Sequence, residues 1–188
     1  MISKTQTSHL DSIGTFLAME IYTKAQKLSE QGRDIIHMEF GEPDFSAPID
    51  AVESVKKSME KNSAGYTLSQ GLEGLRNEIT QKYEDDYGVK IIPEQVLVTN
   101  GSSLLLYMAI RLIAPPNSQV IMTDPCYACY ENVVRLAGVE PVMVELRRED
   151  GFQLDVDDLK EMVTSKTRAI LINSPMNPTG VVFSSEVM

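Results

Sequence analysis

From residue 96 onward, short apolar stretches alternate with helical patterns. The apolar stretches are residues 96–98, 120–122, 141–146 and 169–172, and the helical patterns between them cover residues 102–113, 127–137 and 156–163. Short strands that are apolar on both faces are typical of parallel sheets covered by helices on both sides. The pattern therefore predicts an α/β fold in which a mostly parallel sheet is flanked by helices.

Three further helices are expected upstream of this alternating region. They cover residues 12–31, 48–61 and 72–86, and a glycine follows the first and the last of them, where helices commonly end. Residues 41–45, Gly-Glu-Pro-Asp-Phe, are expected to form a turn. Residues 184–188 are expected to begin a helix with a capping serine. Because natural domains rarely end in a first helical turn, we expect the chain to be a fragment.

Charge and hydropathy exclude several classes of protein. The chain has 27 acidic and 17 basic residues, a net charge of −10, and its basic residues form no stripe that could bind nucleic acid phosphates. No apolar stretch approaches the roughly 20 residues that span a bilayer. The polar N-terminus lacks the apolar core of a signal peptide. We therefore expect a cytoplasmic protein that binds neither nucleic acid nor membrane.

Two cysteines, Cys126 and Cys129, have the Cys-x-x-Cys spacing. This spacing occurs in thiol redox pairs at helix starts and in one half of some zinc sites. The only histidines, His9 and His37, lie far upstream and lack the spacing of zinc ligands. We therefore expect no metal site, and we favour two packing cysteines over a redox pair.

Three predicted strands are each followed by a polar motif. Thr99-Asn100-Gly101-Ser102-Ser103 enters a helix whose first amides could bind an anion, although a simple capped turn would have the same sequence. Tyr127, in Asp124-Pro125-Cys126-Tyr127, could stack on a planar ligand or only cover a helix end. The proline-stiffened segment 173–180 presents Asn177, whose amide can donate to a ring oxygen, or it is only a connection.

The carboxyl ends of parallel strands meet at one edge of a sheet. In open α/β sheets this edge is where ligands bind. At one edge, the three motifs would supply an anion site, a ring for stacking and an amide for a ring oxygen. This coincidence favours a ligand site over three separate connections.

The same motifs make the chain similar to a known family. Over essentially its whole length the sequence resembles the class I/II aminotransferases, which are pyridoxal-phosphate (PLP) enzymes of fold type I related to aspartate aminotransferase. The resemblance rests on residues 41–45, 66–67, 71–76, 98–103, 124–127, 151–152 and 173–180. Met176 and Ala128 depart from the family pattern, which commonly has asparagine and proline at these positions.

The resemblance implies roles for particular residues. Ser102 and Ser103 would hold the cofactor phosphate through their amides, and Tyr127 would stack on the pyridine ring. Asn177 would bond the ring oxygen and lie near the substrate carboxylate. The backbone N–H of Gly41 would bind that carboxylate, at a position where a side chain would obstruct it.

The resemblance also implies an organisation and an assembly. Tyr66 would reach the phosphate bound by a partner subunit, which implies a homodimer with shared active sites. Residues 1–45 would form an N-terminal arm and part of the small domain, and residues 46–188 the N-terminal part of a truncated PLP-binding large domain. The Schiff-base lysine, the aspartate that pairs with the pyridine nitrogen and the arginine that binds the substrate carboxylate map beyond Met188. No catalytic residue is therefore expected in this chain.

The implied function is the transfer of an amino group between an amino acid and a 2-oxo acid, in amino acid metabolism and biosynthesis. Without the lysine, the chain alone is expected to be inactive. Two alternatives stay open. One is another PLP reaction on the same scaffold, such as that of a β-lyase or a synthase, and the other is a non-catalytic truncated relative.

Overall fold

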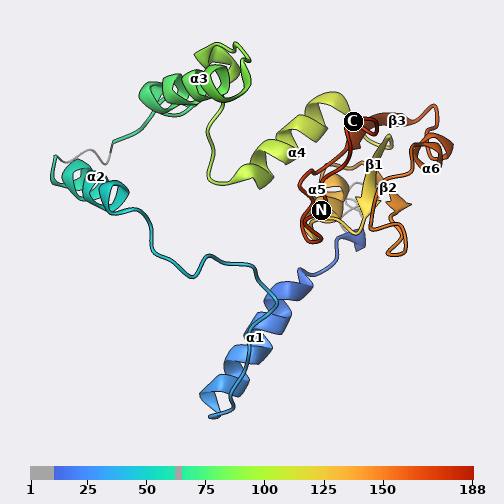
Figure 1. Cartoon of the computed structure of the whole chain (residues 1–188), viewed down its shortest axis with the longest axis horizontal. Helices are drawn as coiled ribbons and strands as arrows, with labels where there is room; N and C mark the ends of the chain where they lie inside the picture. The colour runs from blue at the N-terminus through green and yellow to red at the C-terminus, as the bar shows by residue number, and fades with distance from the viewer. Residues whose placement is uncertain (1–10, 62–64) are drawn as a thin grey trace, which may run out of the picture. The chain divides into compact units, whose positions relative to one another are not determined.

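The computed structural model describes residues 11–61 and 65–188, so that residues 1–10 of the predicted N-terminal arm lie outside the described residues. The chain divides into two units. The first comprises the residues up to Ile21 together with Gly101–Met188, and the second comprises Tyr22–Asn100. Figure 1 shows the helices and strands of both units. The domain boundary predicted between residues 45 and 46 stays a prediction.

The sheet of the first unit has three strands in the order β2-β1-β3. The strands are β1 (Gln119–Asp124), β2 (Glu140–Glu145) and β3 (Thr167–Leu171). β1 is parallel to both neighbours, and its Ile121 lies opposite Val142 on one side and Ile170 on the other. Val120, Ile121 and Met122 are all buried, as expected for the central strand of a sheet covered on both faces. The predicted parallel α/β sheet is thus confirmed.

Two apolar clusters lie on the two faces of this sheet. One includes residues of α4 (Ser102–Ile113) and α5 (Tyr130–Leu136), and its buried members are Ile110, Ala114, Val120, Met122, Val134, Ala137 and Val139. The other is joined by Leu159 of α6 (Val156–Glu161), and its buried members are Ile121, Val144, Leu146, Leu154, Met176 and Phe183. The clusters lie on opposite faces because successive side chains of β1 alternate between them.

The helices of the chain lie close to their predicted ranges. The upstream helices are α1 (Leu17–Glu30), α2 (Ile49–Glu60) and α3 (Glu73–Tyr87), and α4 occupies the predicted residues 102–113. Pro48 precedes α2, and Gly88 closes α3 at φ 66°, a left-handed conformation that favours glycine. At the start of α6, the Asp155 carboxylate accepts a hydrogen bond from the N–H of Asp157.

The predicted strand at residues 96–98 is wrong. The backbone is extended at Val96, with φ −108° and ψ 124°, and the N–H of Val98 donates to the Gln70 carbonyl at 3.0 Å. A strand also needs a neighbour with which to form a ladder of hydrogen bonds, and no residue in the described ranges pairs with this segment in that way.

Two predicted helix starts also differ from the structure. α5 begins at Tyr130 instead of residue 127, because the N–H of Tyr130 bonds to the Tyr127 carbonyl at 2.9 Å and closes a turn before the helix. Residues 184–188 form a single turn, in which the N–H groups of Val187 and Met188 both donate to the Ser184 carbonyl.

The second unit contains most of α1, all of α2 and α3, and a short 3-10 helix, η3 (Pro93–Gln95). Its buried arginine, Arg76, donates through Nη1 to the Gln70 side chain at 3.2 Å and to the Pro93 carbonyl at 2.8 Å. Gly71 lies against Val98, where a Cβ atom on Gly71 would come within 2.7 Å of the Val98 Cβ. These contacts brace residues 70–98 against one another.

Candidate functional site

Two loops leave the sheet at the same edge. β1 and β3 are parallel neighbours, and Met122 lies opposite Leu171, so their carboxyl ends lie together. The loop after β1 carries Tyr127, and the loop after β3 carries residues 173–180. The structure therefore places two of the three predicted motifs, those of Tyr127 and Asn177, at one edge of the sheet.

The loop after β3 is held by its own polar groups. The Asn173 side chain donates to the Pro175 carbonyl at 3.0 Å and accepts from the N–H of Asn177 at 2.9 Å. The N–H of Gly180 donates to the Met176 carbonyl at 2.7 Å. Asn177 itself is exposed, and its side-chain amide has no hydrogen-bond partner among the residues that the structure describes. A fixed backbone and an unengaged amide suit donation to a ligand.

The buried side chain of Met176 anchors this loop to an apolar cluster. Its side chain is 2% exposed and packs in the cluster that contains Ile121, Val144 and Phe183. In the sequence, Met176 stands out only as a departure from the family pattern. The signal that could have indicated its burial was a long apolar side chain in an otherwise polar, proline-rich loop.

Tyr127 lies half-buried in the turn before α5. Its ring meets the Tyr130 ring edge to face, with centroids 5.3 Å apart and an interplanar angle of 80°. A hydrogen bond between its hydroxyl and the Cys129 side chain, together with burial, raises the pKa of Tyr127. The phenol therefore stays neutral at physiological pH, and its ring can stack on a planar ligand without bringing a charge.

Cys126 and Cys129 are free thiols on either side of Tyr127. Burial, with smaller effects from the carboxylates of Asp124 and Glu131, raises the pKa of Cys126 to about 11. A thiol with this pKa stays protonated at neutral pH and is a poor nucleophile and a poor metal ligand. This supports the packing interpretation over a redox pair.

Metal-binding clusters and membrane-spanning helices are absent from the part of the chain that the structure describes. Within residues 11–61 and 65–188, no three His, Cys, Asp or Glu side chains gather in a way that could hold a metal ion. In the same ranges, no helix is both long enough and apolar enough to cross a membrane.

The third motif lies at the start of α4. Gly101 precedes the helix at φ 83°, a conformation that favours glycine. Ser102 and Ser103 are exposed residues of the first turn, whose amides have no acceptor within the helix. α4 packs in the cluster through Leu106, Tyr107 and Ile110, and residues 114–118 connect it to β1. Among the described residues, no hydrogen bond joins Ser102 or Ser103 to the two loops.

Gly41 and Tyr66 belong to the second unit. Gly41 is exposed, and a Cβ atom at this position would meet no described atom within 4 Å. Tyr66 is fully exposed. Their predicted contacts, with a substrate carboxylate and with the phosphate of a partner subunit, stay predictions.

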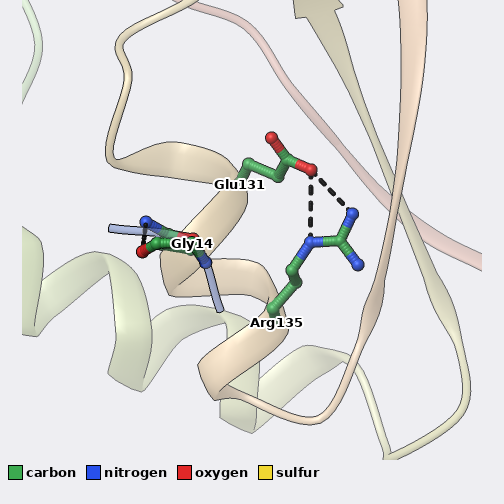
Figure 2. A network of polar contacts seen from close by, with 4 residues as sticks. Gly14, Glu131 and Arg135 are labelled. Carbon is green, nitrogen blue, oxygen red and sulfur yellow. Dashed lines mark hydrogen bonds and ion pairs between the residues drawn. The ribbon is translucent and has the colours of Figure 1, made fainter. Parts of the chain in front are cut away.

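A feature that sequence reasoning missed lies beside the Tyr127 turn. The Asn132 side chain of α5 accepts from the N–H of Gly14 at 3.1 Å and donates to the Gly14 carbonyl at 3.0 Å. Figure 2 shows Gly14 against α5, near the ion pair that joins Glu131 and Arg135 at 2.6 Å. One amide thus satisfies both backbone groups of Gly14, as a neighbouring strand would. It holds the segment before α1 next to the helix that follows Tyr127.

The chain is similar to known proteins. The sequence matches the family described as aminotransferase class I and II over residues 33–187. It is 39% identical over 173 residues to the (5-formylfuran-3-yl)methyl phosphate transaminase of Methanocaldococcus jannaschii, covering 92% of this chain and 45% of that protein. It is 38% identical over 168 residues to the aspartate aminotransferase of Bacillus subtilis, covering 89% of this chain and 43% of that protein.

Solved structures show the same relationship. The aspartate aminotransferase from Thermus thermophilus with maleate has a TM-score of 0.90 at 30% identity, covering 96% of this chain and 47% of that chain. The aspartate aminotransferase from Thermotoga maritima has a TM-score of 0.90 at 35% identity, covering 95% of this chain and 48% of that chain. The chain spans about half the length of the relatives it matches. The predicted resemblance is confirmed, and the chain belongs to the class I and II aminotransferase family.

Proposed function

We propose that the protein containing these residues is a PLP-dependent aminotransferase that moves an amino group between an amino acid and a 2-oxo acid. The observation that carries this proposal is the shared edge of β1 and β3, from which the Tyr127 and Asn177 loops both leave. The relatives at 38–39% identity, a transaminase and an aspartate aminotransferase, support the reaction class.

The described residues fit a phosphorylated pyridine ring. The Asn177 amide, which has no partner among the described residues, can donate to the phenolic oxygen of the ring. The half-buried ring of Tyr127 can stack on the pyridine, and the first-turn amides of Ser102 and Ser103 can bind the phosphate. When bound, PLP supplies an electron sink that withdraws electrons from the α-carbon of the substrate.

The task of this chain is to orient the ring. Stacking on Tyr127 would hold the plane of the ring, the Asn177 amide would hold its rotation within that plane, and Ser102 and Ser103 would hold the phosphate. A ring held in this way would let a substrate that is bound through its carboxylate present the breaking bond in the orientation that transamination requires.

The proposal includes two residues of the second unit and an assembly. The backbone N–H of Gly41 would bind the substrate carboxylate, and Tyr66 would bind the phosphate held by a partner subunit. The protein would then be a homodimer with shared active sites. We place it in the cytoplasm and in amino acid biosynthesis.

Asn177→Ala tests the role of the amide in the full-length enzyme. Loss of a hydrogen bond to a charged ring oxygen should reduce transamination about tenfold or more while the protein stays folded. The rate is measured with an amino acid donor and a 2-oxo acid acceptor. Asn77→Ala, at an exposed position of α3, is the matched control and should leave the rate unchanged. Equal rates for the two variants would contradict the role of Asn177.

Dependence on PLP bound to a lysine is tested on the protein from its natural source. The protein is reduced with borohydride in the presence of PLP, and its intact mass is measured. A chain about twice as long as this one, carrying one reduced cofactor on a lysine, is the expected result. A chain of 20.9 kDa without an adduct would contradict the proposal and favour the non-catalytic alternative.

A further inference from the structure

One buried hydroxyl contacts both loops of the candidate site. Thr123 is the next-to-last residue of β1 and is 5% exposed. Its Oγ1 lies 3.1 Å from the carbonyl oxygen of Pro125 and 3.8 Å from the Sδ of Met176. Pro125 comes two residues before Tyr127, and Met176 comes one residue before Asn177. The hydroxyl thus touches the backbone of one loop and the side chain of the other.

The chemistry of the two contacts differs. A hydroxyl has one proton, a carbonyl oxygen is a strong acceptor, and a thioether sulfur is a weak one. Donation to Pro125 is therefore the stronger bond, and the Met176 sulfur lies against the same oxygen. Both Thr123 and Met176 are almost fully buried, so water cannot easily replace either contact.

Packing keeps both partners in place. Met176 lies in the cluster formed with Ile121, Val144 and Phe183, which fixes the start of the Asn177 turn. Thr123 is β-branched, and such side chains have few χ1 rotamers, so its hydroxyl has little freedom to turn away. A change at Thr123 is therefore transmitted both to the loop that follows it directly and to the loop of Met176, 53 residues further along the chain.

We propose that Thr123 is a positioning residue, whose hydroxyl sets the Tyr127 loop and the Asn177 loop in a fixed relation to each other. This inference rests on the proposed function, since it assigns the two loops to one cofactor. It also gives Met176 a role, as the side chain through which the Asn177 loop is coupled to β1.

Three variants separate this role from general stability. Thr123→Val removes the hydroxyl and keeps the branched shape, and Thr123→Ser restores the hydroxyl. Ser118→Ala is the matched control, because Ser118 is also 5% exposed and donates to a carbonyl, that of Pro115, at 2.6 Å. Ser118 precedes β1, at the opposite edge of the sheet from Thr123. Thr123→Val and Ser118→Ala each remove a buried hydroxyl and should therefore lower the melting temperature. Only the hydroxyl of Thr123 contacts the two loops.

The first readout is NMR of the 188-residue chain, with the methionine methyl groups and the tyrosine rings labelled. Thr123→Val should shift the Met176 methyl signal and the Tyr127 ring signals together, Thr123→Ser should restore both, and Ser118→Ala should shift neither. A shift confined to one loop, or equal shifts in Thr123→Val and Ser118→Ala, would overturn the coupling.

The second readout is the affinity of the same chain for pyridoxamine 5′-phosphate, measured by isothermal titration calorimetry. This probe lacks an aldehyde and cannot react with surface lysines. Thr123→Val should raise its dissociation constant about threefold to tenfold, the range expected for the loss of one buried hydrogen bond, and Ser118→Ala should not. Equal affinities for these two variants would overturn the positioning role.

The two readouts also separate this inference from the function on which it rests. If the unsubstituted chain did not bind the probe and the NMR signals of both loops still moved together, the coupling would be supported and binding of the cofactor by these residues alone contradicted.

Discussion

The two units of the chain differ in how they bury their apolar side chains. Residues 101–188 build two apolar clusters on opposite faces of β1. In the described part of residues 22–100, only Ala25, Arg76 and Val96 are buried, while Ile36 is 84% exposed and Met38 is 87% exposed. The first unit thus makes a core from its own strands and helices, whereas in the second the polar contacts around Arg76 connect Gln70, Arg76 and Pro93.

This difference separates the predicted site residues into two classes. Tyr127 and Asn177 lie on loops anchored in the clusters of the first unit, so their positions follow from a packed core. Gly41 and Tyr66 are exposed and belong to the unit without such clusters. A preorganised site needs rigid support, and the part formed by β1 and β3 has it.

The largest predicted effect lies in the core of the first unit. Ile121 is fully buried, so Ile121→Ala should leave a cavity and lower the free energy of unfolding by about 2–5 kcal/mol. Ile36→Ala, the matched change in the second unit, should alter it by less than about 0.5 kcal/mol. Urea denaturation followed by circular dichroism measures both. Similar losses would show that the two units do not differ in this way.

A smaller effect is predicted for the braced part of the second unit. Gly71 has φ 96° and lies against Val98, so Gly71→Ala should cost at least about 1 kcal/mol from backbone strain. Gly74→Ala is the control with the opposite sign. Gly74 lies within α3 with no atom near its Cβ position, so alanine there should stabilise the helix by up to about 1 kcal/mol.

Hydrogen exchange at the Val98 amide, which donates to the Gln70 carbonyl, reports this local effect. Gly71→Ala should speed exchange at Val98, and Gly74→Ala should not. If Gly71→Ala left the exchange rate at Val98 unchanged, the close contact between Gly71 and Val98 would not be what stabilises this part of the chain.

The last predicted effect, which is absent at neutral pH, is the pH dependence of stability from Cys126. Its pKa is raised from 9.0 to about 11 in the folded chain, so below pH 9 both states keep the proton. Between these two values the unfolded state loses the proton and the folded state keeps it, which lowers the free energy of unfolding as the pH rises.

Cys126→Ala should make this alkaline decline shallower, and Cys129→Ala should leave the contribution of Cys126 in place. Urea midpoints at about pH 8 and about pH 10.5 measure the decline in each variant. An equal decline in the unsubstituted chain and in Cys126→Ala would show that this thiol is not desolvated by the fold.

Most elements of the first unit could be predicted from local pattern. α4 occupies the predicted residues 102–113, and all three strands overlap their predicted apolar stretches. The wrong prediction of a strand at residues 96–98 arises because local pattern alone does not decide whether a strand forms. Val98 lies in an apolar, extended segment, but a strand exists only where a neighbour forms its ladder, and the composition of the segment does not report that neighbour.

The features of the candidate site also divide into those that neighbouring residues predict and those that depend on distant contacts. Tyr127 and Asn177 could be predicted because each follows a strand in a turn rich in proline and polar residues. The contact of Thr123 with Met176 and the hydrogen bonds of Asn132 with Gly14 could not be predicted, because the two residues of each pair lie 53 and 118 positions apart.

By itself, the sequence determined the α/β class, the family, and the turns that present Tyr127 and Asn177, because these depend on periodicity and turn chemistry among neighbouring residues. Only the tertiary structure decided the strand order β2-β1-β3, the burial of Met176 and the placement of one hydroxyl beneath two loops. The physical reason is that contacts between distant residues depend on which strands become neighbours, and this is settled by packing of the whole core.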